Sequence, residues 1–268
     1  MQSWHAVDVS TPTIWSGGRY EAVAARIAPI ATEVIEALER RLPIRDAALV
    51  DLACGTGNAA LVAAARGARV TAVDITPELV AIGAHKAEAE GRSITWVTAD
   101  ASDTGLPARS FDAVVSNMGI IFVEPVSLVA EVVRLLKPAG AVGFSSWVHD
   151  PANPFFTPIV DVLGPPPASG YSPDQWGEPD TITARLSGEF DDLGIENGLH
   201  TWEFKSVRAG LHFLTHESPL HIDVLSRVDQ GQRERLLAAF EAALAAHSRA
   251  DGSVSFDAPY VVVTARRR

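Results

Sequence analysis

The chain has 268 residues, of which 47% are hydrophobic, so it is long and apolar enough for one large α/β domain with a full core. Its 33 acidic and 22 basic residues leave a net charge of −11, which argues against nucleic-acid binding and anionic membranes, because phosphate contacts need clustered Lys and Arg. A single cysteine, without a signal-peptide pattern or a long apolar run, predicts a cytoplasmic protein with no disulfide and no membrane insertion.

Residues 1–44 predict a helical cover at the N-terminus. Residues 1–14 are irregular, and apolar residues then recur at three- and four-residue steps from Ile27 to Leu38. Pro29 lies within this run and is expected to divide it into two helices.

The stretch Leu49–Asn58 predicts a strand, a glycine turn and the start of a helix, as at the beginning of a nucleotide-binding βαβ unit. Gly55 and Gly57 allow a sharp turn and the close approach of a ligand. This pattern also fits the fingerprint of NAD-binding proteins. Asp51 sharpens the interpretation, since a carboxylate at the end of the strand can pair with an ammonium group, which a dinucleotide lacks.

Strands over residues 69–73, 94–98, 111–117 and 141–147 alternate with predicted helices, which indicates a parallel sheet covered on both faces. Asp51 and Asp74 end the first two strands, and Asp100 follows the third. All three acids should therefore meet at the ligand-binding edge of the sheet. Asp74 can accept both hydroxyls of a ribose, and Asp100 can accept an adenine amino group beside the N–H of Ala101.

Three motifs carry a resemblance to a known family: Asp51-Leu52-Ala53-Cys54-Gly55-Thr56-Gly57, Ser110–Asn117 and Arg134–Gly140. They resemble the class I S-adenosylmethionine-dependent methyltransferases, and are similar to the small-molecule ubiquinone/menaquinone-type enzymes. Ala53 departs from the family, which usually has a glycine there. The resemblance implies a Rossmann-like, doubly wound, seven-stranded, mostly parallel sheet. It also implies an antiparallel last strand, N-terminal helices and a helical insertion before that strand.

The resemblance further implies a single methyltransferase domain over residues 1–268, with a cofactor-binding core at 45–147. S-Adenosylmethionine would be the cofactor and S-adenosylhomocysteine the product. The residues expected to bind the cofactor are Trp15, Arg19, Tyr20, Asp51, Ala53, Cys54, Gly55, Thr56, Gly57, Asp74, Ile75, Asp100, Ala101 and Asn117. For Trp15, Arg19 and Tyr20 the alternative is helix packing with exposed polar tips.

The C-terminal half is expected to recognise the acceptor. Residues 148–179 are rich in proline and aromatic residues, and form either a lid or a structural wrap over a sheet edge. A helix over 180–193 and a strand over 195–204 follow. The insertion at 205–250, with a helix at 231–248, either caps the acceptor pocket or forms a homodimer contact. The last strand is expected at 260–264, starting after Pro259.

His149 and Asp150 are the first candidates for a general base, because the loop after the fifth strand should flank the acceptor. The alternative for both is a surface turn. His200, His212, His216 and His221 are each expected to be structural, with the alternative that one of them faces the acceptor pocket. No metal site is predicted, because no His, Cys or Asp cluster has the spacing of metal ligands.

The predicted function is methyl transfer from S-adenosylmethionine to a small, apolar or aromatic acceptor molecule, at oxygen rather than nitrogen or carbon. One alternative is an NAD-dependent oxidoreductase, which leaves Asp51 and Asp100 unexplained. The other is a non-catalytic subunit that binds S-adenosylmethionine.

Overall fold

The computed structural model describes residues 14–165 and 171–268. The chain forms two compact units. The sheet unit comprises residues 27–149, 171–198 and 259–268. The helical unit comprises the described residues up to 26 and those of 150–170, together with 199–258.

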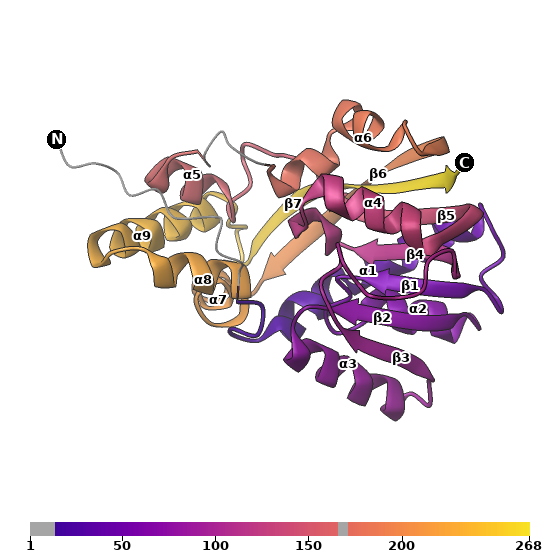
Figure 1. Cartoon of the computed structure of the whole chain (residues 1–268). Helices are drawn as coiled ribbons and strands as arrows, with labels where there is room; N and C mark the ends of the chain where they lie inside the picture. Colours follow the sequence, from indigo (N-terminus) through magenta and orange to yellow (C-terminus); the bar gives the residue numbers. More distant parts are fainter. Residues whose placement is uncertain (1–13, 166–170) are drawn as a thin grey trace. The chain divides into compact units, whose positions relative to one another are not determined.

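The chain forms a seven-stranded sheet with the order β3-β2-β1-β4-β5-β7-β6. The strands are β1 (Ala48–Leu52), β2 (Arg69–Asp74), β3 (Ile94–Thr98), β4 (Phe111–Asn117), β5 (Leu136–Trp147), β6 (Phe190–Phe204) and β7 (Val254–Arg267). Neighbours among β1 to β5 pair in parallel, and β7 pairs antiparallel with β5. Figure 1 shows β3, β2, β1 and β4 side by side. The predicted fold class, with its antiparallel last strand, is confirmed.

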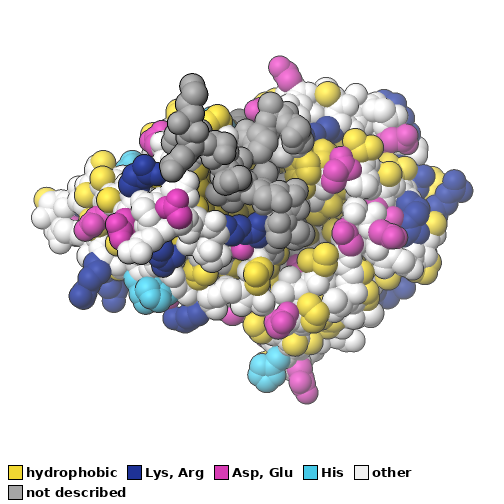
Figure 2. All heavy atoms as spheres, turned by 60° about the vertical axis from the view of Figure 1, so that its left-hand side comes forward, with side chains coloured by type: hydrophobic (Ala, Val, Ile, Leu, Met, Phe, Trp, Pro, Cys, Tyr) yellow, Lys and Arg dark blue, Asp and Glu magenta, His cyan; other side chains and the backbone are white. Residues whose placement is uncertain are grey.

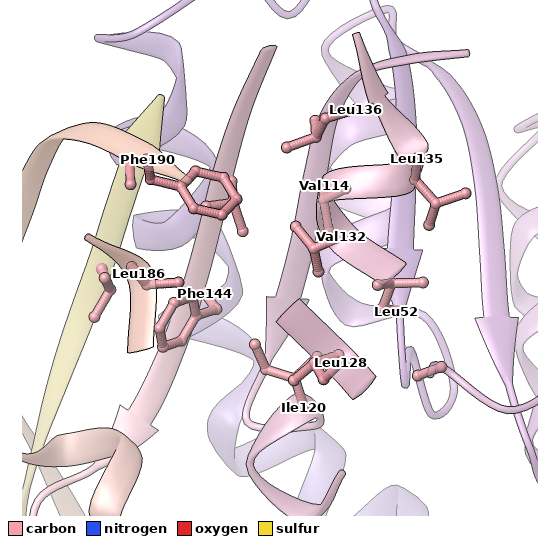
Figure 3. Close-up of a cluster of buried hydrophobic side chains, with 14 of the residues drawn as sticks. Leu52, Val114, Ile120, Leu128, Val132, Leu135, Leu136, Phe144, Leu186 and Phe190 are labelled. Carbon is pink, nitrogen blue, oxygen red and sulfur yellow. The ribbon is translucent and has the colours of Figure 1, made fainter. Parts of the chain in front are cut away.

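Helices cover both faces of the sheet. They are α1 (Tyr20–Glu39), α2 (Asn58–Ala65), α3 (Pro77–Ala89), α4 (Pro125–Leu135) and α6 (Pro179–Leu186), with short turns η1 (Ile120–Phe122) and η2 (Pro173–Gly177). Leu49 of β1 packs in one apolar cluster with residues of α1 and α2. Its neighbour Val50 faces the opposite side, in a second cluster with α4 and α6. Figure 3 shows this second cluster, in which Leu52 and Val114 from the strands meet Leu128 of α4.

The prediction that Pro29 divides the N-terminal helix is wrong, because α1 runs unbroken from Tyr20 to Glu39. Pro29 is exposed, while Ile30, Val34 and Leu38 are buried. A proline in a helix removes one backbone hydrogen bond. We attribute the continuity to the burial of this apolar face, which outweighs that loss.

Three predicted boundaries were also wrong. β5 begins at Leu136 instead of 141, because the expected turn at 137–140 is taken up by an irregularity in the pairing with β4. β6 begins at Phe190 instead of 195, and the preceding helix α6 correspondingly ends at Leu186 instead of 193. β7 begins at Val254, so Pro259 lies inside it, where the Pro259 carbonyl still accepts a 2.9 Å hydrogen bond from the Val148 N–H.

The helical unit contains α5 (Thr157–Leu163), α7 (Val207–His212), the π-helical turn η3 (Phe213–Glu217), α8 (Pro219–Arg227) and α9 (Gln230–Ala246). Four of these elements lie between β6 and β7, which confirms the predicted helical insertion. Phe155 centres the core of this unit, with ring centroids 5.0 Å from Trp202 and 4.9 Å from Phe256. In the described ranges, no helix combines the length and apolar character needed to span a bilayer.

Candidate functional site

Asp51 is a buried acid at the end of β1, with 1% of its surface exposed. Its Oδ2 accepts a 2.9 Å hydrogen bond from the N–H of Ala60, near the start of α2. Its Oδ1 has no hydrogen-bond partner among the described residues. Burial raises the pKa of this carboxyl to about 8, against the lowering effect of the Ala60 hydrogen bond and with a smaller rise from Asp74. Because leaving a buried acceptor unpaired is unfavourable, Oδ1 is suited to a donor supplied by a ligand.

The chain leaves β1 through the glycine loop (residues 53–57), whose backbone is left-handed at three positions. The φ angles are 49° at Ala53, 55° at Gly55 and 86° at Gly57. A side chain at Gly57 would also collide with the indole of Trp96. The Ala53 angle explains why a glycine is favoured at this position, since alanine adopts it only with strain.

Two further predicted residues, Cys54 and Thr56, are buried within the glycine loop. Burial raises the pKa of the Cys54 thiol well above its ordinary value, and the charges of Asp51 and Asp74 raise it further. This thiol is therefore protonated at neutral pH and is not an activated nucleophile.

Asp74, the last residue of β2, holds the glycine loop. Its Oδ2 accepts a 2.7 Å hydrogen bond from the N–H of Gly55, and its Oδ1 accepts one of 2.9 Å from Thr76. Burial raises the Asp74 pKa, and these two hydrogen bonds oppose the rise. The next residue, Ile75, is 57% exposed and presents an apolar surface beside the acid. Binding of a ribose by Asp74 stays a prediction.

Asp100 lies just after β3, as predicted, but on an exposed turn. Its Oδ1 accepts hydrogen bonds from the backbone N–H and the hydroxyl of Ser102, at 2.8 and 2.7 Å. Ala101 is buried. The structure thus links Asp74 and the glycine loop by a direct hydrogen bond and places Asp100 on a separate turn.

Asn117, the last residue of β4, is hydrogen bonded at both ends of its side chain. Its Nδ2 donates to the carbonyl of Ile27 at 3.3 Å, and its Oδ1 accepts from the hydroxyl of Ser145 at 2.9 Å. These contacts orient the amide and join α1, β4 and β5.

Three predicted cofactor residues, Trp15, Arg19 and Tyr20, lie in the helical unit. The rings of Trp15 and Tyr20 meet edge to face, with centroids 6.5 Å apart. Arg19 forms a 3.1 Å ion pair with Glu217, and its backbone N–H donates to the Glu217 carbonyl. Their contact with a cofactor stays a prediction.

The candidate general bases lie on the loop after β5. His149 is 63% exposed, and its Nδ1 is 3.2 Å from the carboxylate of Asp174. Asp150 accepts a 2.9 Å hydrogen bond from the N–H of Ala152, as a turn residue does. No contact here tests either residue as a base, so that role stays a prediction.

His221 has a structural environment. It is 3% exposed, and its two ring nitrogens contact the Ser218 hydroxyl at 2.7 Å and the Phe155 carbonyl at 3.0 Å. Burial lowers its pKa to about 4, so the ring is neutral at neutral pH.

In the segment 148–179, Phe155 and Trp176 are buried, whereas Phe156 is 40% exposed. Trp176 is 1% exposed, meets Phe144 edge to face at 5.3 Å and lies under the guanidinium of Arg185 at 4.5 Å. The Tyr171 hydroxyl donates to the Phe122 carbonyl at 2.7 Å. These contacts hold Tyr171 and Trp176 within the sheet unit, and both the lid and the structural wrap stay predictions.

Sequence reasoning missed two buried serines that connect the loops at the strand ends, Ser116 of β4 and Ser145 of β5. It also missed Trp96, which packs on Gly57. The available signal was a polar residue at a buried strand position, which demands a hydrogen-bond partner.

Comparison with known proteins matches residues 50–144 to a methyltransferase domain family. The chain is 30% identical over 151 residues to aklanonic acid methyltransferase DauC of Streptomyces sp. (strain C5), covering 54% of this chain and 68% of that protein. It is 27% identical over 265 residues to an uncharacterised protein of Mycobacterium tuberculosis, covering 95% and 93% of the two chains.

Among solved structures, the fold is similar to that of phosphoethanolamine N-methyltransferase 2 of Haemonchus contortus. That structure was solved with phosphomonomethylethanolamine and S-adenosylhomocysteine. The TM-score is 0.55 at 20% identity, and the match covers 88% of this chain and 52% of that one. The chain therefore spans about half the length of this structural relative.

Proposed function

The chain belongs to the class I S-adenosylmethionine-dependent methyltransferases, and on this premise we propose that it methylates a small, apolar or aromatic acceptor at oxygen. S-Adenosylmethionine is the methyl donor, and S-adenosylhomocysteine is the product. Family membership sets aside the NAD-dependent oxidoreductase and the non-catalytic subunit.

Asp51 is the observation that carries the proposed cofactor site. Its buried Oδ1 lacks a partner among the described residues, and the amino-acid portion of the cofactor carries an ammonium group that can donate to it. A charge-assisted hydrogen bond in a buried position is among the stronger polar contacts. A dinucleotide has no ammonium group and would leave this oxygen without that donor.

The other residues have distinct proposed roles. Asp74 accepts hydrogen bonds from the ribose and keeps its contact with Gly55 through one oxygen. Ile75 offers its exposed side chain to the adenine, and Asp100 accepts from the adenine amino group beside the N–H of Ala101. The remaining proposed contacts in the sheet unit are Ala53, Cys54, Thr56, Gly57 and Asn117.

The chemistry of this cofactor class places modest demands on the protein. The sulfonium supplies a methyl group with an excellent leaving group, so the chain mainly has to align the acceptor and exclude water. A base is needed only where the acceptor loses a proton as it attacks. His149 and Asp150 are the proposed bases, and their exposed loop is compatible with proton exchange with solvent.

Two observations support a small-molecule acceptor. The relative DauC is by its name a methyltransferase for aklanonic acid. The chain carries a net charge of −11, and acidic and basic side chains are intermixed over the described part of the face in Figure 2. Neither the net negative charge nor this mixed surface favours a polyanion such as a nucleic acid.

The proposal is tested by incubating the protein with S-adenosylmethionine and matched pairs of acceptors: phenols and hydroxylated aromatic acids against the corresponding anilines. Formation of S-adenosylhomocysteine with a mass gain of one methyl group on the hydroxyl compounds is expected. Methylation of only the amines would overturn oxygen as the acceptor atom.

A further inference from the structure

The hydroxyl of Ser116 connects the ends of β1 and β4. It is 1% exposed, donates a 2.7 Å hydrogen bond to the Leu52 carbonyl and accepts one of 3.1 Å from the Ile120 N–H. Leu52 is the last residue of β1, directly before the glycine loop. One buried hydroxyl therefore ties the start of the glycine loop to the turn after β4.

Ser145 of β5 makes a matching connection to the same turn. It is fully buried, donates to Asn117 Oδ1 at 2.9 Å and accepts from the Met118 N–H at 3.1 Å. The two serines together make hydrogen bonds to four polar groups: the Leu52 carbonyl, Asn117 Oδ1 and the N–H groups of Met118 and Ile120.

The two loops that these serines hold are strained and closely packed. Ala53 and Met118 have left-handed backbones, with φ angles of 49° and 58°. A Cβ on Gly119 would collide with the Ala53 carbonyl and side chain. Non-glycine residues keep such conformations only where surrounding contacts determine them.

We infer that Ser116 and Ser145 are positioning residues for S-adenosylmethionine, acting through the glycine loop and the turn at 117–120. This rests on the proposed cofactor site. The serines hold Ala53 and Met118 in place, and thereby keep the glycine loop in the conformation to which the cofactor binds.

The test is a calorimetric titration of S-adenosylhomocysteine into the wild type and Ser116→Ala. Ser146→Ala is the matched control, because Ser146 is equally buried on β5 but its hydroxyl donates to the carbonyl of the adjacent Trp147. We expect Ser116→Ala to weaken binding about tenfold, Ser116→Thr to recover most of the affinity, and Ser146→Ala to stay within twofold of the wild type.

The melting temperature of each variant separates positioning from a general structural role. A merely structural serine would lower the melting temperature and leave the affinity of the folded protein unchanged, and this result for Ser116→Ala would overturn the inference. If Ser116→Ala does not fold, Ser145→Ala decides by the same criteria. Failure of the wild type to bind would instead overturn the proposed cofactor site.

Discussion

The Asp74 carboxylate accepts a 2.7 Å hydrogen bond from the N–H of Gly55, so the acid that ends β2 braces the loop that follows β1. Asp74 therefore holds the glycine loop, and by our proposal it also binds the ribose. Both depend on its oxygen atoms.

We therefore expect Asp74→Ala to weaken S-adenosylhomocysteine binding by at least ~1.5 kcal/mol, the scale of a hydrogen bond to a charged group. Asp74→Asn should lose less, because its amide oxygen can still accept from Gly55. Isothermal calorimetry on folded variants measures both. Equal affinity of wild type and Asp74→Ala would remove Asp74 from the site.

Asp51 should make stability depend on pH. Its pKa in the folded chain is about 8, against 3.8 as the ordinary value, so the folded state holds a proton that the unfolded state releases between these values. The contribution of Asp51 to stability is therefore full below pH 3.8 and is lost as the pH rises toward 8. Relative to the wild type, Asp51→Asn should gain stability from pH 5 to pH 8, measured by urea unfolding. A constant difference would show that Asp51 is already ionised at pH 5.

His221 should act in the opposite direction. Burial lowers its pKa from 6.5 to about 4, so the folded state resists a proton that the unfolded state takes up. Its contribution is full above pH 6.5 and is lost as the pH falls to 4. In His221→Asn, the free energy of unfolding should fall less between pH 6.5 and 4 than in the wild type. A parallel loss in both proteins would contradict the neutral, buried assignment.

Ala53 carries strain that a glycine would relieve. Its φ of 49° lies in the left-handed region, which costs an L-residue about 1–2 kcal/mol. The greater freedom of glycine in the unfolded chain offsets part of this gain. Ala53→Gly should raise the free energy of unfolding by up to ~1 kcal/mol, whereas Ala63→Gly inside α2 should lower it. Denaturant unfolding measures both, and destabilisation by Ala53→Gly would contradict the strain.

Much of this arrangement could be predicted from the sequence, because the carboxyl ends of parallel strands lie along one edge of the sheet. Asp51, Asp74 and Asp100 lie at the strand ends where they were expected. The hydrogen bond between Asp74 and Gly55 could not be predicted, since it depends on how the glycine loop turns. The continuity of α1 through Pro29 depends on packing against residues that are distant in the sequence. The rule that a proline breaks a helix considers only the local sequence and does not include this packing.

The most direct measurement of the central claim is a calorimetric titration of S-adenosylhomocysteine into the wild type and Asp51→Asn at pH 7, with NAD titrated in parallel. We expect the wild type to bind S-adenosylhomocysteine but not NAD. We also expect Asp51→Asn to bind at least tenfold more weakly, because the ammonium group favours the ionised form of Asp51 when it binds beside Oδ1, and an asparagine cannot carry that charge. Equal affinity of the two proteins, or binding of NAD alone, would contradict it.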